Sequence, residues 1–244
     1  MAQTPKQKTI ETYQKKDIVE VFDKERSKYL FQRYKHETEA NFLKKAIKGI
    51  KKEKIKVLDV ACGTGRMLPD VFSTKKEIEY HGLDTSKQML EELKKKAKKI
   101  RKLKEIKIHL SDAAKMPFKN NEFDLVYTYH LLWHIEREDQ KKVIKEMIRI
   151  TKPKGLIIFD VLNNNFIWEN LKKFFGKKKI EGLYKISLDE AKEFIGKDKD
   201  IKIEKFADAP IKNDFLYQIF NLINKLNKVL PSSFYHMIFL RTRK

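Results

Sequence analysis

Residues 55–66 read Ile-Lys-Val-Leu-Asp-Val-Ala-Cys-Gly-Thr-Gly-Arg, and this run carries the strongest fold signal in the chain. Its first half is apolar and β-branched, as in a buried strand of a parallel sheet. Its second half holds Gly63 and Gly65, where the strand must turn sharply into the next element. Glycine tolerates positive φ and has no Cβ, so a ligand can approach the backbone closely. A strand, a glycine turn and a helix start predict a nucleotide-sized binding site at the carboxyl end of the strand.

The details of the glycine turn exclude two common nucleotide sites. A dinucleotide fingerprint would need glycine or alanine at position 68, which is Leu68. A phosphate-binding P-loop would need Lys-Ser or Lys-Thr after the glycines, and neither follows. The run Val-Leu-Asp-Val-Ala-Cys-Gly-Thr-Gly closely resembles the first motif of class I S-adenosylmethionine-dependent methyltransferases. The cofactor of that family carries no phosphate, so a third glycine is not required.

Strand-like and helix-like segments alternate along the chain after this motif. Strands separated by amphipathic helices predict βαβ units and a parallel sheet. Expected strands cover 78–83, 106–110, 123–128, 156–162, 201–206 and 234–240. Expected helices cover 66–72, 86–101, 136–151, 188–195 and 213–230, with a turn at 152–155. Ser187 and Glu190 form a capping-box pattern at the start of one of these helices.

The resemblance extends over residues 50–162 and implies the architecture. Residues 123–134 and 148–155 resemble the fourth strand and the approach to the fifth strand of the methyltransferase type 11 group, although Pro-Lys-Gly replaces its usual Pro-Gly-Gly. The family fold is a Rossmann-like α/β three-layer sandwich with a seven-stranded, mostly parallel sheet and one antiparallel strand. We predict a single domain over 1–244. It comprises N-terminal helices in 1–50, a cofactor-binding core in 51–162 and a variable part in 163–244 with a helical insertion at 210–231.

Two aromatic-rich helices are expected between residues 17 and 51, with a break near Arg26 and Ser27. One interpretation packs them against the sheet as core. The other makes them a helical lid that closes over the ligand. The sequence leaves both interpretations open.

Acidic residues near or just after the ends of three expected strands define the predicted cofactor site. Asp84, 25 residues after Asp59, suits the ribose hydroxyls of an adenosine, with a helix N-cap as the alternative. The resemblance implies that Asp112 and Ala113 hold the adenine, and that Asp59 lies near the methionine amine. We predict S-adenosyl-L-methionine as cofactor and S-adenosyl-L-homocysteine as its product. The predicted cofactor contacts are Asp59, Ala61, Cys62, Gly63, Thr64, Gly65, Asp84, Thr85, Met89, Asp112, Ala113 and Thr128.

A proton acceptor is needed only if the methyl acceptor carries a proton at neutral pH. His130 and His134 follow the fourth strand and are the weak catalytic candidates, although a histidine there can equally hydrogen-bond backbone. Asp160 and Asn163 lie near the end of the fifth strand and could polarise an acceptor. With Cys62 as the single cysteine and six scattered histidines, we predict no metal.

The net charge of +21 leaves the partner open. Basic residues are mostly lysines spread along the whole chain, as compositional drift would produce, but an anionic partner fits the same charge. The leading hypothesis is methyl transfer to an O, N or C nucleophile of a small or lipid-like acceptor. The alternatives are a tRNA or RNA methyltransferase and a non-enzymatic membrane-surface protein. We expect no transmembrane segment and a cytoplasmic location, and nothing in the sequence indicates an oligomeric state.

Overall fold

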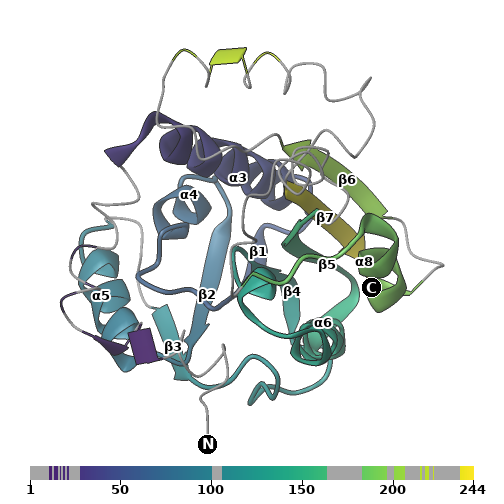
Figure 1. The fold of residues 1–244 in the computed structure, drawn as a ribbon. Coiled ribbons are helices and arrows are strands. Elements are labelled where there is room, and N and C mark those ends of the chain that lie inside the picture. The colour runs from purple at the N-terminus through teal and green to yellow at the C-terminus, as the bar shows by residue number, and fades with distance from the viewer. Residues whose placement is uncertain are drawn as a thin grey trace, which may run out of the picture.

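The computed structural model describes residues 28–100, 106–163, 183–196, 201–206 and 237–244, with isolated positions in 11–21 and 215–222. These residues form a twisted central sheet in the strand order β3-β2-β1-β4-β5-β7-β6 (Figure 1). The strands are β1 (Lys54–Val60), β2 (Glu77–Asp84), β3 (Ile106–Leu110), β4 (Phe123–Thr128), β5 (Thr151–Leu162), β6 (Ile201–Phe206) and β7 (Met237–Arg243). Strands β1 to β5 are parallel, whereas β7 runs antiparallel to both β5 and β6. The predicted Rossmann-like α/β class is therefore confirmed.

Helices cover both faces of this sheet and make three layers. The first face carries α3 (Leu30–Lys48), α4 (Leu68–Phe72) and α5 (Lys87–Ala97). The second face carries α6 (Arg137–Ile150) and α8 (Leu188–Ile195), and the short 3-10 helix η1 (Leu132–His134) precedes α6. A separate apolar cluster fills each interface, because alternate residues of a parallel strand point to opposite faces. The carboxyl ends of β1 to β4 thus lie side by side at one edge.

Most expected elements are confirmed to within a few residues. Strands β3, β4 and β6 have the predicted bounds, and Ser187 caps α8 through the predicted capping box with Glu190. Helix α5 is shorter than expected, ending at Ala97. Strand β7 spans Met237–Arg243 and extends past the predicted end at residue 240, whereas residues 234–236 lie outside the described part of the chain.

The predicted turn at 152–155 is wrong, because β5 starts at Thr151 and runs through it. A register shift between Phe123 and Leu125 of β4 absorbs the extra residues. Lys154 has a φ of +64°, and its backbone N–H donates to the Lys244 carbonyl. A Pro-Lys-Gly sequence therefore produces a bulge within a strand here, which is a common place for proline in a sheet.

The N-terminal helices are described only in part. Helix α3 confirms the core interpretation over its second half, where Phe42, Leu43, Ala46 and Ile47 are buried against the sheet. The first expected helix lies mostly outside the described residues. Gln14 is described, and its side-chain amide donates to the backbone carbonyl of Thr85 at 3.0 Å. The lid interpretation stays a prediction.

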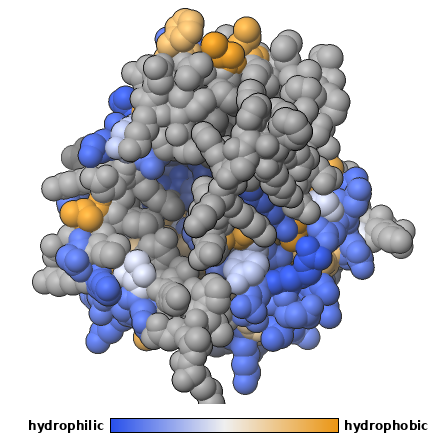
Figure 2. Space-filling model, in the orientation of Figure 1, coloured by the Kyte–Doolittle hydropathy of each residue, from blue (hydrophilic) through white to orange (hydrophobic). Residues whose placement is uncertain are grey.

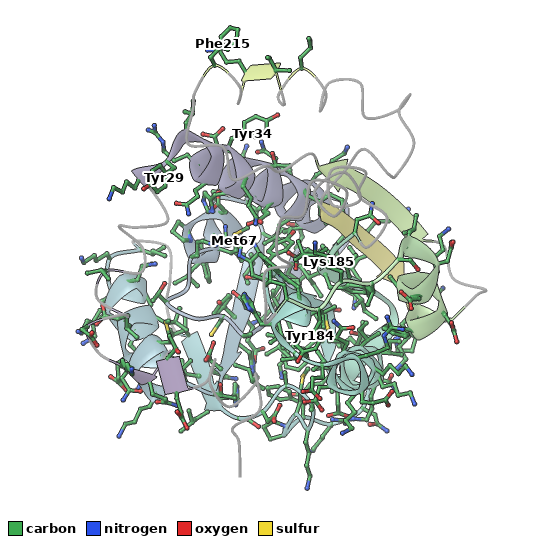
Figure 3. All side chains as sticks on the ribbon, in the orientation of Figure 1. Tyr29, Tyr34, Met67, Tyr184, Lys185 and Phe215 are labelled. Carbon is green, nitrogen blue, oxygen red and sulfur yellow. The ribbon has the colours of Figure 1, made fainter. Side chains whose placement is uncertain are left out.

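The predicted insertion at 210–231 is described at only four positions, all of them helical. Three of these carry large apolar side chains, and Phe215, Ile219 and Leu222 are exposed to 70%, 43% and 59%. Phe215 lies at the end of the molecule beyond α3 (Figure 3), where Figure 2 also shows apolar surface. These three side chains are therefore not part of the buried core.

Candidate functional site

A cavity lies at the carboxyl ends of the parallel strands, as the glycine motif predicts. Ten of the twelve predicted cofactor contacts line it, and so do both catalytic candidates, His130 and His134. Gly65 and Thr128 are the two predicted contacts that are not among its lining residues. The lining residues are Asp59, Ala61, Cys62, Gly63, Thr64, Arg66, Met67, Leu83, Asp84, Thr85, Met89, Ser111, Asp112, Ala113, Tyr129, His130, Leu131, His134, Ile135 and Val143.

The two glycines of the turn serve different purposes. Gly63 has a φ of +54°, and a Cβ there would meet no atom within 4 Å, so the turn leaves open space beside the cavity. Gly65 has a φ of +73°, but its Cβ would lie 2.2 Å from Cδ1 of Leu93 on α5. The prediction that Gly65 contacts the ligand is therefore not supported by its position. Its missing side chain lets the turn pack against α5, which fixes the shape of the cavity wall.

Asp84 ties the end of β2 to the glycine turn. Its Oδ2 accepts the Gly63 N–H at 2.8 Å, and its Oδ1 accepts the Ser86 N–H at 2.9 Å. The N-cap of α5 is Ser86, whose side chain accepts the Met89 N–H, so the capping alternative for Asp84 is wrong. Burial raises the pKa of Asp84. Each carboxylate oxygen has a second lone-pair site, so Asp84 can still accept hydroxyl protons from a ligand.

Asp59 is held by two tyrosines on neighbouring strands. The hydroxyl groups of Tyr80 on β2 and Tyr127 on β4 donate hydrogen bonds to its Oδ2 at 2.8 and 2.7 Å. Burial raises the pKa of Asp59 to about 7, although both tyrosine hydroxyls oppose the shift. Asp59 therefore changes charge close to neutral pH, and a cation placed beside it would favour its ionised form.

The third acidic position lies after β3. Oδ1 of Asp112 accepts the Ala114 N–H at 2.8 Å, which forms a local turn, and Ala113 is largely buried. Asp112 and Ala113 both line the cavity. The sheet order β3-β2-β1 places Asp112, Asp84 and Asp59 in that sequence along one edge.

Thr128 does not have the predicted position. It is fully buried, and its hydroxyl donates to the Val60 carbonyl at 2.8 Å, which links β4 to β1. All residues of β4 are buried, on both faces of the sheet. The alternation of side chains along this strand therefore cannot predict which of them face the cavity.

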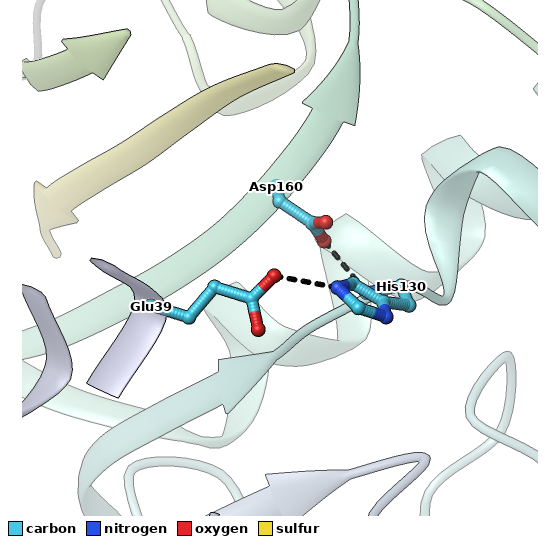
Figure 4. Close-up of side chains that lie close together, drawn as sticks. All are labelled: Glu39, His130 and Asp160. Atoms are coloured by element: carbon cyan, nitrogen blue, oxygen red, sulfur yellow. Dashed lines mark hydrogen bonds and ion pairs between the residues drawn. The ribbon is translucent and has the colours of Figure 1, made fainter. Parts of the chain in front are cut away.

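A second group of charged side chains is joined by short contacts, and we call Glu39, Arg66, His130 and Asp160 the charge cluster. Two of its members, Arg66 and His130, line the cavity. Glu39 on α3 is fully buried, and its Oε2 lies 2.6 Å from Nη2 of Arg66. Its Oε1 lies 2.6 Å from Nε2 of His130 (Figure 4). The backbone N–H of His130 donates to Oδ1 of Asp160 on β5 at 2.8 Å. The cluster thus joins α3, the glycine turn, the end of β4 and β5.

The two acids of the charge cluster are shifted in opposite directions. Burial alone would raise the pKa of Glu39, but Arg66 and His130 hold it well below its usual range. Burial and the nearby Glu39 carboxylate raise the pKa of Asp160 to about 7. Glu39 is thus ionised, and Asp160 is partly protonated near neutral pH.

The two histidines differ in their partners. His130 has a φ of +65°, which is strained for a non-glycine residue, and its Nε2 pairs with the Glu39 carboxylate. The backbone N–H of His134 donates to the Leu131 carbonyl within η1, and its ring stacks on Trp133 with centroids 5.0 Å apart. The alternative that the His134 ring hydrogen-bonds backbone stays a prediction. Asn163, the other polar candidate, is buried and forms a bridge with Ile186 away from the lining residues.

Three members of the charge cluster have the spacing of a metal site. Glu39, His130 and Asp160 each offer one ligand atom, and these atoms lie within 4.8 Å of one another. However, the guanidinium of Arg66 already provides a permanent positive charge 2.6 Å from the Glu39 carboxylate. A cation bound there would have to overcome its repulsion, so we assign no metal to these residues.

Sequence reasoning missed Glu39 and Arg66. Glu39 lies four and seven residues before Leu43 and Ala46, on the apolar face of α3. A carboxylate on the buried face of an amphipathic helix requires a partner of opposite charge, and this signal could have identified it. Arg66 follows the glycine turn directly, but no local pattern indicates which way its side chain points.

Comparison with known proteins agrees with the architecture of the site. Residues 57–155 match the family described as "Methyltransferase domain". The chain is 36% identical over 106 residues to a demethylmenaquinone methyltransferase of Geobacillus sp. and 30% identical over 114 residues to a sterol 4-C-methyltransferase of Caenorhabditis elegans. These matches cover 42% and 46% of this chain, and 43% and 33% of the relatives, so less than half of each relative is spanned.

Solved structures show the same fold at lower identity. The magnesium protoporphyrin IX methyltransferase of Synechocystis PCC 6803, with bound S-adenosylhomocysteine, superposes with a TM-score of 0.63. It is 16% identical, and the match covers 88% of this chain and 84% of that chain. The resemblance inferred from the first motif to class I methyltransferases is therefore confirmed for the matched domain. Within the part of the chain that is described, no helix has the length and apolarity to span a bilayer.

Proposed function

We propose that this chain transfers a methyl group from S-adenosylmethionine to a small, apolar acceptor. The observation that carries the proposal is the row of Asp112, Asp84 and Asp59 at the ends of β3, β2 and β1, around one cavity and below the Gly63 turn. This row offers hydrogen-bond acceptors to an adenine amino group, to ribose hydroxyls and to an ammonium group, in the order in which the cofactor carries them.

The residues present fit the cofactor. Gly63 leaves the open space that a ligand lying against the backbone needs, and Asp84 is buried with both oxygens fixed by backbone N–H groups. Thr85 and Met89 line the wall beyond Asp84. Gln14 bonds to the Thr85 carbonyl, which supports an N-terminal segment that covers this rim.

The bound cofactor supplies an activated methyl group on a positively charged sulfur, so the protein has mainly to align the acceptor and exclude water. We assign His130 rather than His134 as the residue that accepts a proton from the acceptor. His130 is one of the residues that line the cavity, and its Nε2 lies 2.6 Å from Oε1 of Glu39. A carboxylate that orients an imidazole and stabilises its protonated form is the arrangement used in general-base catalysis.

The nature of the cavity wall supports an apolar acceptor. Leu131, Ile135 and Val143 line it beyond the charged residues. The relatives named above act, by their names, on demethylmenaquinone, a sterol and magnesium protoporphyrin IX, which are all largely apolar small molecules. No described feature adds support to RNA as the acceptor beyond the net charge. A cytoplasmic location and a single domain over 1–244 stay predictions.

The proposal is tested in two steps. Calorimetric titration of S-adenosylhomocysteine should show binding to the wild type, a loss of about 100-fold or more in Asp84→Ala, and no change in the exposed control Asp189→Ala. Labelled methyl donor is then offered with a short-chain reduced demethylmenaquinone and, separately, with tRNA. Label in the quinol supports a small, apolar acceptor, whereas label in tRNA contradicts it and indicates RNA as the acceptor. Absence of binding, or equal binding by Asp84→Ala, contradicts the cofactor assignment.

A further inference from the structure

The cavity has an unequal charge distribution. Its described lining includes three aspartates, Asp59, Asp84 and Asp112, but Arg66 is the one residue among them with a permanent positive charge. A methyl donor of the proposed kind has cationic groups, which suit the aspartates. It also has one anionic group, the α-carboxylate of its methionyl part, which none of these aspartates can bind.

Arg66 lies at the end of the cavity where the methionyl part of the cofactor, and so its carboxylate, is expected. It follows Gly65 directly, at the β1 end of the row, on the side of Asp59 rather than of Asp112. Its neighbour Met67 lies below α3 in Figure 3 and also lines the cavity. The side chain of Arg66 keeps 18% of its area exposed, so it is neither sealed in the core nor open on the surface.

Helix α3 fixes the guanidinium from one side. Nη1 of Arg66 lies 2.8 Å from Nδ1 of His36, and Nη2 lies 2.6 Å from Oε2 of Glu39. His36 and Glu39 are three residues apart and therefore share one face of α3. His36 is in turn held by Asp70 through its Nε2 at 3.2 Å. These contacts engage Nη1 and Nη2 once each, and a guanidinium has five N–H donors, so it has the capacity to bind a second carboxylate.

We propose that Arg66 binds the α-carboxylate of the methionyl part of the cofactor, and that Glu39 and His36 position its guanidinium for this. The inference rests on the proposed function, because it assigns one more contact of the same cofactor. Arginine suits this role, since its planar fork can bind two carboxylates at once in a fixed geometry. A ligand carboxylate there also completes an alternation of charge from Glu39 to Arg66 to the ligand.

The experiment compares S-adenosylhomocysteine with its decarboxylated analogue, which keeps the amine and lacks only the carboxylate. Calorimetry should show that the wild type prefers S-adenosylhomocysteine by about 10- to 100-fold, as expected for a charge-assisted hydrogen bond. Arg66→Met should bind both compounds with nearly equal affinity, and Arg66→Lys should keep part of the preference. Glu39→Gln should lower the preference several-fold without changing the affinity for the analogue. The exposed Arg137→Met is the matched control and should behave as the wild type.

The outcomes separate the two proposals. If Arg66→Met keeps the wild-type preference, or loses affinity for both compounds equally, the carboxylate assignment is overturned. If Arg66→Met does not fold because Glu39 is left unpaired, the double variant Glu39→Gln/Arg66→Met removes both charges and must show the same loss of preference. If the wild type binds neither compound, the proposed function itself fails.

Discussion

The glycine turn and the charge cluster both contribute residues to the wall of one cavity, yet they are built in different ways. The turn is made of residues close in sequence: Gly63, Gly65 and the adjacent strand end, tied by a single side chain, Asp84, from the next strand. The charge cluster joins Glu39 and His130, 91 residues apart, with Arg66 and Asp160 between and beyond them. A local backbone conformation leaves a readable pattern in sequence, whereas a contact between distant elements does not.

Removal of the central carboxylate should have the largest effect on stability. Glu39→Leu leaves Arg66 without its main counter-ion in a largely buried place, which should lower the free energy of unfolding by about 3–5 kcal/mol. Urea denaturation followed by circular dichroism measures this. Glu37→Leu, an exposed position on the same helix, is the matched control and should change stability by less than about 0.5 kcal/mol. Equal effects of the two substitutions would show that the cluster has no special role in stability.

The glycine turn should respond to a smaller change, and its two glycines should respond differently. Gly65→Ala forces a Cβ against Leu93 at a positive φ and should lower the free energy of unfolding by about 2 kcal/mol. Adding Leu93→Ala removes the clash and should recover part of this loss, but Leu93→Ala also leaves a cavity whose cost exceeds the recovered part. Gly63→Ala has open space and should cost about 1 kcal/mol, as strain alone. Thermal unfolding of both variants and of the double variant provides the comparison. A larger loss in Gly63→Ala would contradict the assignment of packing to Gly65.

Cofactor affinity should depend on pH through Asp59. Because burial raises the pKa of Asp59 to about 7, its carboxyl is protonated in the free protein below that pH. A ligand ammonium group favours the ionised form, so the affinity for S-adenosylhomocysteine should rise up to about tenfold per pH unit below 7 and level off above it. Calorimetry between pH 5.5 and 8.5 tests this. Asp59→Asn should remove the part of the slope due to this residue, and an unchanged slope would assign it to other groups.

The same shifts set a weaker trend in the stability of the ligand-free protein. Asp59 and Asp160 both have folded-state pKa values raised to about 7, so between pH 4 and 7 the folded state binds more protons than the unfolded chain. Their contribution to the free energy of unfolding therefore falls as pH rises through this window. Glu39, with its lowered pKa, contributes stability that is lost only as pH falls below its usual range. Urea unfolding of the wild type and Asp160→Asn at pH 5 and 8 should show a smaller pH difference in the variant.

The sequence by itself determined the layered α/β fold and the acidic residues at the strand ends. Hydrophobic periodicity, a glycine turn and capping residues act over a few neighbouring positions, so a single sequence records them. It also placed Asp84 at the end of the second strand, although only the structure distinguished it from the helix cap, which is Ser86.

Only the tertiary structure decided which polar residues face the cavity. Thr128 lies in β4, which is buried on both faces, so the alternation of side chains along this strand does not indicate which residues reach the site. Glu39 and Arg66 meet because α3 packs on the sheet face that also carries α4 and α5, which depends on the shape of the whole core rather than on local sequence. Burial then sets the charges, since the low-dielectric interior raises the pKa of Asp59 and Asp160 while its ion pairs keep Glu39 ionised.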